Sequence, residues 1–161
     1  MNTSPTPPCE ISWFGALCDD DYEFLGVPDP RLASSWAHCR GIVERAEAGG
    51  FDNILLPSGY TLGIDTTAFA AAMAAVTERI RLTTSIAIVP YRNTAMFAKE
   101  AASVDVLSGG RLTLGLAPGI RRAHRSLDLV EALDAHLRGH DHGAQLLGAA
   151  GRLPLRLVLL V

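Results

Sequence analysis

The residues that most clearly suggest a binding site are small ones at the end of a strand-like run. That run, residues 112–116, carries Gly115 and ends on the sequence Ala117-Pro118-Gly119. An end with so little side-chain bulk either forms only a turn or lets a large, flat molecule approach the backbone.

Other residue types give weaker signals of chemistry. Histidines four apart on a helix can share a metal ion, as in the group His136, His140, Asp141 and His142. Gly139 is expected to end that helix, so no metal site is predicted. The acidic run 19–21 could bind a cation, but a solvated loop explains it better.

Composition narrows the class of protein. The chain has 161 residues, of which 48% are hydrophobic, enough for one domain with a real core. A net charge of −3 offers no basic surface for nucleic acid. The cysteine count of 3, without CxxC spacing, argues against disulfides and zinc and favours a reducing, cytoplasmic setting. Residues 1–10 lack signal-peptide features and are expected to be disordered, and no membrane span is expected.

Apolar strand-like runs alternate with helical patterns along the chain. The predicted strands are 11–16, 51–57, 81–89 and 112–116. Helices are expected to begin at Ser34 or Ser35, at Asp65, and at Asn93 or Thr94, and the third would turn Phe97, Ala101, Val104 and Leu107 inward. This alternation predicts an α/β fold with a parallel sheet, either doubly wound or part of a (β/α)₈ barrel.

Both architectures place ligands at the carboxyl ends of the strands. Those ends are predicted at Ala16-Leu17, Pro57-Ser58-Gly59, Val89-Pro90 and Ala117-Pro118-Gly119. No strand is followed by GxGxxG, which argues against a dinucleotide site, and no GxxxxGK[ST] is present.

Two longer motifs carry a family resemblance. One is AEAGGFDNILLPSG, and the other is Asp105-x-Leu107-Ser108-x-Gly110-Arg111 followed at once by a strand. Between about residues 11 and 120 the chain resembles the luciferase-like flavin monooxygenases, most of all their alkanesulfonate monooxygenase branch. The resemblance implies an α/β half-barrel: the first four βα units of a (β/α)₈ TIM-type barrel.

The same resemblance implies a site for the flavin FMN at the strand ends. The implied cofactor-binding residues are Ser85, Ile86, Gly115, Ala117 and Gly119, with a cis peptide bond between Ser85 and Ile86. The expected substrate-binding residues are Trp13, Gly59, Tyr60 and Asp65. Two positions depart from the branch, because Gly63 stands where it has a cysteine and Gly115 where it has an asparagine.

The activity implied is oxygenation of a small organic substrate, such as an alkanesulfonate, by dioxygen and reduced FMN. A separate flavin reductase would supply the reduced FMN, and the chain is expected to form a homo-oligomer. Two alternatives stay open. One is a deazaflavin-dependent oxidoreductase of the same superfamily, and the other is a non-catalytic half-barrel fragment that self-associates through open sheet edges.

The expected organisation is a disordered segment 1–10, a half-barrel 11–120 and a divergent tail 121–161. A complete barrel needs about 250 residues, so we expect the tail to reflect truncation or a shifted reading frame. One helix is expected in it, over residues 126–138, and an apolar run closes the chain.

Overall fold

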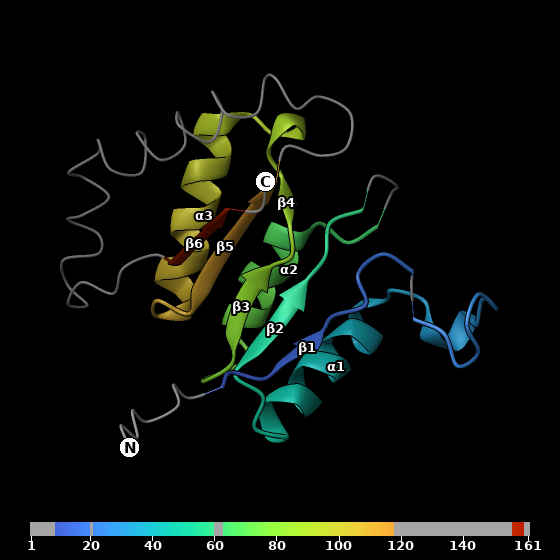
Figure 1. Cartoon of the computed structure of the whole chain (residues 1–161). Helices are drawn as coiled ribbons and strands as arrows, with labels where there is room; N and C mark the ends of the chain where they lie inside the picture. The colour runs from blue at the N-terminus through green and yellow to red at the C-terminus, as the bar shows by residue number, and fades with distance from the viewer. Residues whose placement is uncertain (1–8, 20, 60–62, 118–155, 160–161) are drawn as a thin grey trace, which may run out of the picture.

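A parallel sheet forms the centre of the protein. The computed structural model describes residues 9–19, 21–59, 63–117 and the backbone of 156–159 (Figure 1). Strands β1 (Ser12–Phe14), β2 (Asn53–Leu56), β3 (Arg81–Thr84) and β5 (Leu112–Ala117) lie side by side in that order. Strand β4 (Ala87–Ile88) also pairs with β5, and every pairing is parallel. The predicted α/β half-barrel is confirmed.

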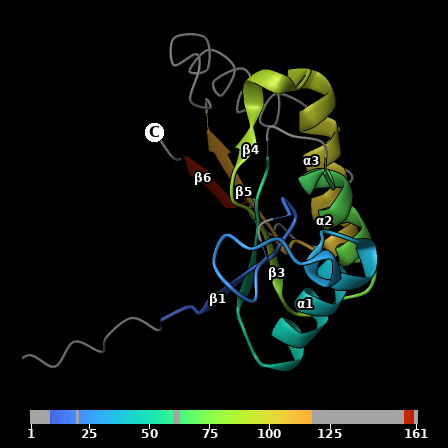
Figure 2. The same cartoon turned by 90° about the vertical axis from the view of Figure 1, so that its right-hand side faces the viewer.

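All of the described α-helices cover one face of this sheet (Figure 2). They are α1 (Trp36–Ala48), α2 (Thr66–Ala74) and α3 (Thr94–Ser108). The short 3₁₀ turns η1 (Pro30–Leu32) and η2 (Val89–Tyr91) precede α1 and α3. The side chains of Ser35, Asp65 and Asn93 cap their N-termini by accepting backbone N–H groups. Each cap is a residue proposed from the sequence.

The strand register separates two faces. Ile54, Leu82 and Leu112 lie in one row across the sheet, and all are buried beneath the helices. The neighbouring row holds Phe14 and Leu55 on the opposite face, where Phe14 remains 47% exposed. This opposite face corresponds to the interior of a barrel.

The predicted strand 81–89 is interrupted. It divides into β3 and β4, and the Ser85–Ile86 peptide bond between them is cis, as the resemblance implied. Pairing with β5 stops at Thr83 and resumes at Ala87. The Thr84 hydroxyl bonds the backbone of β5 within this gap.

One helix face differs from its prediction. In α3 the residues Phe97, Ala101 and Val104 are buried as expected, but Leu107 is 63% exposed. Ser108 takes the inward position instead, because its hydroxyl accepts the backbone N–H of Arg111 and closes the turn into β5.

Arg111 fastens the amino ends of the strands to the helices. Its guanidinium donates to the carbonyl oxygens of Ala74, Thr77, Ile80 and Ser108 at 2.7–3.1 Å, and to the Thr77 hydroxyl. Glu47, at the end of α1, accepts the backbone N–H groups of Glu78, Arg79 and Ile80. These contacts fix the positions at which β3 and β5 begin. The carboxyl ends of the two strands are positioned from these fixed starting points.

The apolar run near the C-terminus forms a further strand. Strand β6 (Arg156–Leu159) pairs in parallel with β5, from Thr113 opposite Arg156 to Leu116 opposite Leu159. The helix expected over 126–138 lies outside the described residues. Among the helices that the structure does describe, none has the length and apolarity to cross a bilayer.

Candidate active site

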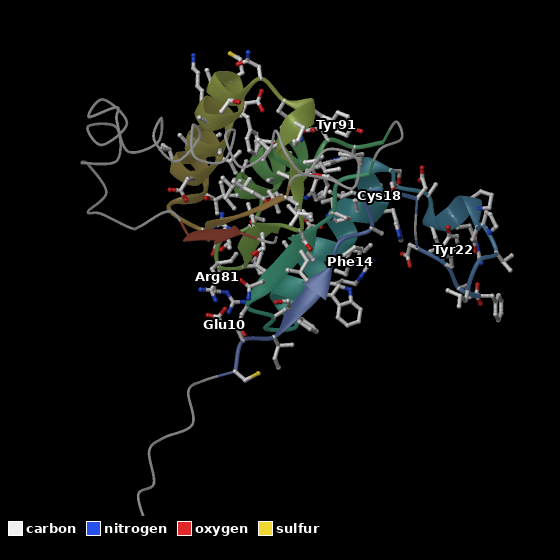
Figure 3. The ribbon with its side chains drawn as sticks, turned by 45° about the horizontal axis from the view of Figure 1, so that its top comes forward. Glu10, Phe14, Cys18, Tyr22, Arg81 and Tyr91 are labelled. Carbon is white, nitrogen blue, oxygen red and sulfur yellow. The ribbon has the colours of Figure 1, made fainter. Side chains whose placement is uncertain are left out.

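A cavity of about 300 Å³ opens at the carboxyl ends of the strands. Its walls come from the chain after β1, the β2–α2 connection and the turn after β4. Cys18 and Tyr91, which Figure 3 labels, belong to the first and third of these walls. The full lining is Leu17, Cys18, Ser58, Gly59, Gly63, Ile64, Asp65, Thr66, Ile88, Tyr91 and Arg92.

The opposite ends of the strands are closed by charged contacts. Glu10, just before β1, pairs with Arg81 at the start of β3 at 2.5 Å (Figure 3). Arg81 also donates to the side chain of Asn53, at the start of β2. The cavity of about 300 Å³ therefore lies at the end where parallel α/β sheets bind their ligands.

Asp65 joins two walls of the cavity. One carboxylate oxygen accepts the N–H groups of Thr67 and Ala68, and the other lies 2.5 Å from the Arg92 guanidinium. Burial raises the pKa of Asp65, but the hydrogen bonds from Ala68 and Arg92 outweigh it and leave the pKa below its ordinary value. Asp65 therefore stays negatively charged and links the β2–α2 connection to the β4–α3 connection. Its carboxylate oxygens already accept hydrogen bonds from protein donors.

Arg92 is the cation of this cavity, and its charge is already balanced. Its guanidinium also lies 3.6 Å from Glu100 and 5.0 Å from the centre of the Phe97 ring. Two carboxylates and an aromatic face thus hold Arg92 against α3. This arrangement fixes the side chain on the cavity wall.

A chain of hydroxyl groups lies beside Gly59. The Thr66 hydroxyl donates to the carbonyl oxygen of Pro57 at 2.6 Å, and the Ser58 hydroxyl lies 2.7 Å from the Thr66 oxygen. Thr66 is buried, whereas Ser58 is half-buried and faces the cavity. The end of β2 thus presents one uncharged polar group to a ligand.

Gly115 was expected to leave room for a cofactor, but the structure gives another reason for its missing side chain. A Cβ atom at this position would lie 2.2 Å from the carbonyl oxygen of Thr84. The space above Gly115 is therefore occupied by β3. Its role as a cofactor contact stays a prediction, and the glycine is explained without one.

The structure brings together only part of the predicted site. Gly59 and Asp65 line the cavity. Ser85 and Ile86 are half-buried at the break after β3, and Ala117 is buried at the end of β5. Trp13 lies apart from these, because its ring packs edge-on against Phe51 in a groove beside α1. Tyr60 and Gly119 lie outside the described residues.

The sequence patterns did not single out Tyr91, Arg92 or Thr66. Tyr91 and Arg92 directly follow Pro90, which marked a predicted strand end, so their position was the available signal. The contact between Arg92 and Asp65 joins two loops 27 positions apart, and local patterns do not reveal it. Among the described residues no group of three or more His, Cys, Asp or Glu side chains could hold a metal ion.

The carboxyl ends of the strands, called the rim below, are compatible with a planar cofactor. Ser85 and Ile86 lie at the break between β3 and β4, Ala117 ends β5, and the small residues Gly59 and Gly63 line the cavity on the β2 side. A flat ring system could approach such a surface closely.

The model of the luciferase-like monooxygenase family matches residues 24–139. The chain belongs to this family. Among curated relatives, a sulfoquinovose monooxygenase of Novosphingobium aromaticivorans is 77% identical over 74 residues, covering 46% of this chain and 20% of that protein. A sulfoquinovose monooxygenase of Agrobacterium fabrum is 43% identical over 133 residues, covering 77% of this chain and 34% of that protein. The expected family is confirmed, although these relatives carry a different name from the alkanesulfonate branch.

Solved structures of this luciferase-like fold agree with the architecture. A riboflavin lyase with modified FMN has a TM-score of 0.62 at 18% identity, over 80% of this chain and 36% of its own. An EDTA monooxygenase of a Chelativorans species has a TM-score of 0.57 at 18% identity, over 88% of this chain and 37% of its own. A coenzyme F420-dependent reductase of Methanopyrus kandleri scores 0.52 at 20% identity, over 74% of this chain and 29% of its own. The chain spans about a third or less of the curated relatives above.

Proposed function

We propose that this chain supplies the strand ends that bind cofactor and substrate in a flavin-dependent monooxygenase. We propose further that the substrate is a sulfonated sugar of the sulfoquinovose type. The observation that carries the proposal is the cavity at the carboxyl ends of β1, β2 and β4, in a chain 77% identical over 74 residues to a sulfoquinovose monooxygenase. The substrate and the choice of flavin are both part of the proposal.

One departure from the alkanesulfonate branch supports a different substrate. Gly63 replaces that branch's cysteine, and a Cβ atom at Gly63 would lie 3.2 Å from the Leu17 carbonyl oxygen. Any side chain here would press on the opposite wall of the cavity. The glycine therefore keeps the cavity wider on this side, which suits a bulky ring better than a narrow alkyl chain.

Reduced FMN, brought by a separate flavin reductase, would supply the electrons with which dioxygen oxygenates the substrate. The residues proposed to hold it are Ser85, Ile86 and Ala117, with Gly115 behind them. Asp65 and Arg92 would keep the two connecting loops in place around the substrate. The apolar side chains of Leu17, Ile64 and Ile88 would limit the entry of water.

Titration of FMN into the purified chain, followed by flavin fluorescence, tests the cofactor part of the proposal. We expect saturable binding at micromolar concentrations, about −8 kcal/mol. Ser85→Tyr should abolish it by filling the rim, whereas the matched exposed substitution Ser103→Tyr on α3 should leave it unchanged. A folded wild-type chain that binds no FMN would contradict this part, and preferential binding of coenzyme F420 would favour the deazaflavin alternative.

Oxygenation itself is measured separately. With a flavin reductase, NADH and FMN present, sulfoquinovose should accelerate the consumption of dioxygen. In ¹⁸O₂, one labelled oxygen atom should enter the organic product. Label confined to water, at a rate independent of sulfoquinovose, would count against a monooxygenase activity of this chain.

A further inference from the structure

We infer that Ser58 selects substrates that carry a hydroxyl group, because the protein fixes it as a hydrogen-bond acceptor at the cavity wall. This inference rests on the proposed function and deepens it by naming a specificity-determining residue. It concerns the direction of one hydrogen bond, which follows from the atoms around Thr66.

Counting protons fixes that direction. Thr66 has one hydroxyl proton, and the carbonyl oxygen of Pro57, 2.6 Å away, can only accept. The proton of Thr66 is therefore committed to Pro57. The Ser58 oxygen lies 2.7 Å from the Thr66 oxygen, so the proton between these two atoms must come from Ser58.

The burial of Thr66 keeps this arrangement in place. Thr66 is 1% exposed, so water cannot replace either of its partners at low cost. Ser58 spends its only proton on Thr66 and retains lone pairs that accept. Because Ser58 is half-buried and lines the cavity, a ligand meets an acceptor there.

Two other polar side chains of the cavity are already engaged within the protein. Asp65 and Arg92 are paired with each other, and the described residues give Arg92 a second carboxylate in Glu100. Ser58 is thus the side chain at the end of β2 that can accept a hydrogen bond from a ligand hydroxyl group. A sugar ring supplies such donors, whereas the alkyl chain of an alkanesulfonate has none.

Site-resolved titration of the full chain tests the inference. Sulfoquinovose and pentane-1-sulfonate are added to ¹⁵N-labelled protein, and the amide signals of Ser58, Gly59 and Thr66 are followed. We expect sulfoquinovose to bind more tightly, and Ser58→Ala to reduce that preference by roughly two- to tenfold, the range of one hydrogen bond. Ser58→Thr retains the acceptor and should retain the preference.

Thr66→Val provides the decisive comparison, because it frees the Ser58 proton without touching Ser58. Ser58 can then donate as well as accept, so the affinity for an all-acceptor probe, per-O-methylated glucose, should rise relative to wild type. Circular dichroism establishes that each variant is folded. Equal preference in wild type and Ser58→Ala, no change in Thr66→Val, or no sulfoquinovose-induced shift at these amides would overturn the inference. FMN binding and sulfoquinovose-dependent consumption of dioxygen, measured independently, test the proposed function.

Discussion

The hydroxyl oxygen of Thr84 lies 2.8 Å from both the backbone nitrogen and the carbonyl oxygen of Gly115. It accepts from the N–H group and donates to the carbonyl, so a side chain replaces the backbone ladder where the third strand breaks. The same close approach brings the Thr84 carbonyl oxygen against the Cα of Gly115. The break in the third strand is thereby held by a tight contact between two neighbouring strands.

Gly115→Ala should destabilise the fold strongly. The new Cβ atom would lie 2.2 Å from a backbone oxygen, so β3 or β5 must move, at a cost of about 1–3 kcal/mol or more. Urea denaturation measures this loss. Gly41→Ala is the control, since its Cβ meets only the mobile end of Arg45 within α1, and it should stabilise the protein by up to about 1 kcal/mol. Equal stability of the two variants would contradict the contact.

Thr84→Val should cost about 1–3 kcal/mol, because it leaves the buried N–H and C=O groups of Gly115 without their hydroxyl partner. Valine has nearly the same shape as threonine, so packing changes little. Thr84→Ser keeps the hydroxyl and should cost less. Thermal unfolding followed by circular dichroism ranks the two variants, and a serine variant weaker than the valine variant would refute this role of the hydroxyl.

Arg111→Lys should lower the free energy of unfolding by about 2 kcal/mol or more. A lysine ammonium cannot reach the carbonyl oxygens of Ala74, Ile80 and Ser108 together, as the planar guanidinium does. Arg40→Lys on α1 disturbs only surface contacts of a half-buried side chain with Glu44 and the Trp36 ring, and should stay within about 0.5 kcal/mol of wild type. Denaturation curves that show the same small change for both would mean that Arg111 does not fasten the strands.

Glu47→Gln should lower the free energy of unfolding most at neutral pH. Burial raises the pKa of Glu47, but hydrogen bonds from the backbone N–H groups of Ile80, Arg79 and Glu78 lower it more, to below its ordinary 4.5. The carboxylate therefore contributes stability above pH 4.5, and this contribution is lost as pH falls through the lowered pKa. Unfolding midpoints of variant and wild type should converge as the pH falls below 4.5. A difference between the two unfolding midpoints that grows as the pH falls would contradict this prediction.

Asp105→Asn should show the reverse dependence. Burial raises the pKa of the Asp105 carboxyl above its ordinary 3.8, although the backbone N–H of Leu112 partly opposes this. Its oxygen Oδ1 has no hydrogen-bond partner within the described structure. The folded state then binds the proton more tightly, so wild-type stability falls as pH rises from 3.8 through the raised pKa. Relative to wild type, the variant should gain stability over that window in urea titrations, and a constant difference would exclude this effect.

The sequence by itself determined the order of elements and where the binding end of the sheet lies. Alternation of apolar runs with capped helices is local information, so Ser35, Asp65 and Asn93 could be proposed as caps from their neighbours alone. The glycines and prolines that follow the strands likewise marked the carboxyl ends, and Leu17, Ser58 and Gly59 do line the cavity there.

Only the tertiary structure decided what those positions do. Gly115 looked like open space in the sequence, but the carbonyl of a residue 31 positions away fills it. Trp13 sat at a suitable strand but faces Phe51 and α1, because a strand turns successive side chains to opposite faces. Pairing of Asp65 with Arg92, and of Ser58 with Thr66, depends on how loops meet in space. Hydrogen-bond direction and charge balance depend on contacts between residues that are separate in the sequence. A local pattern of residues therefore cannot predict them.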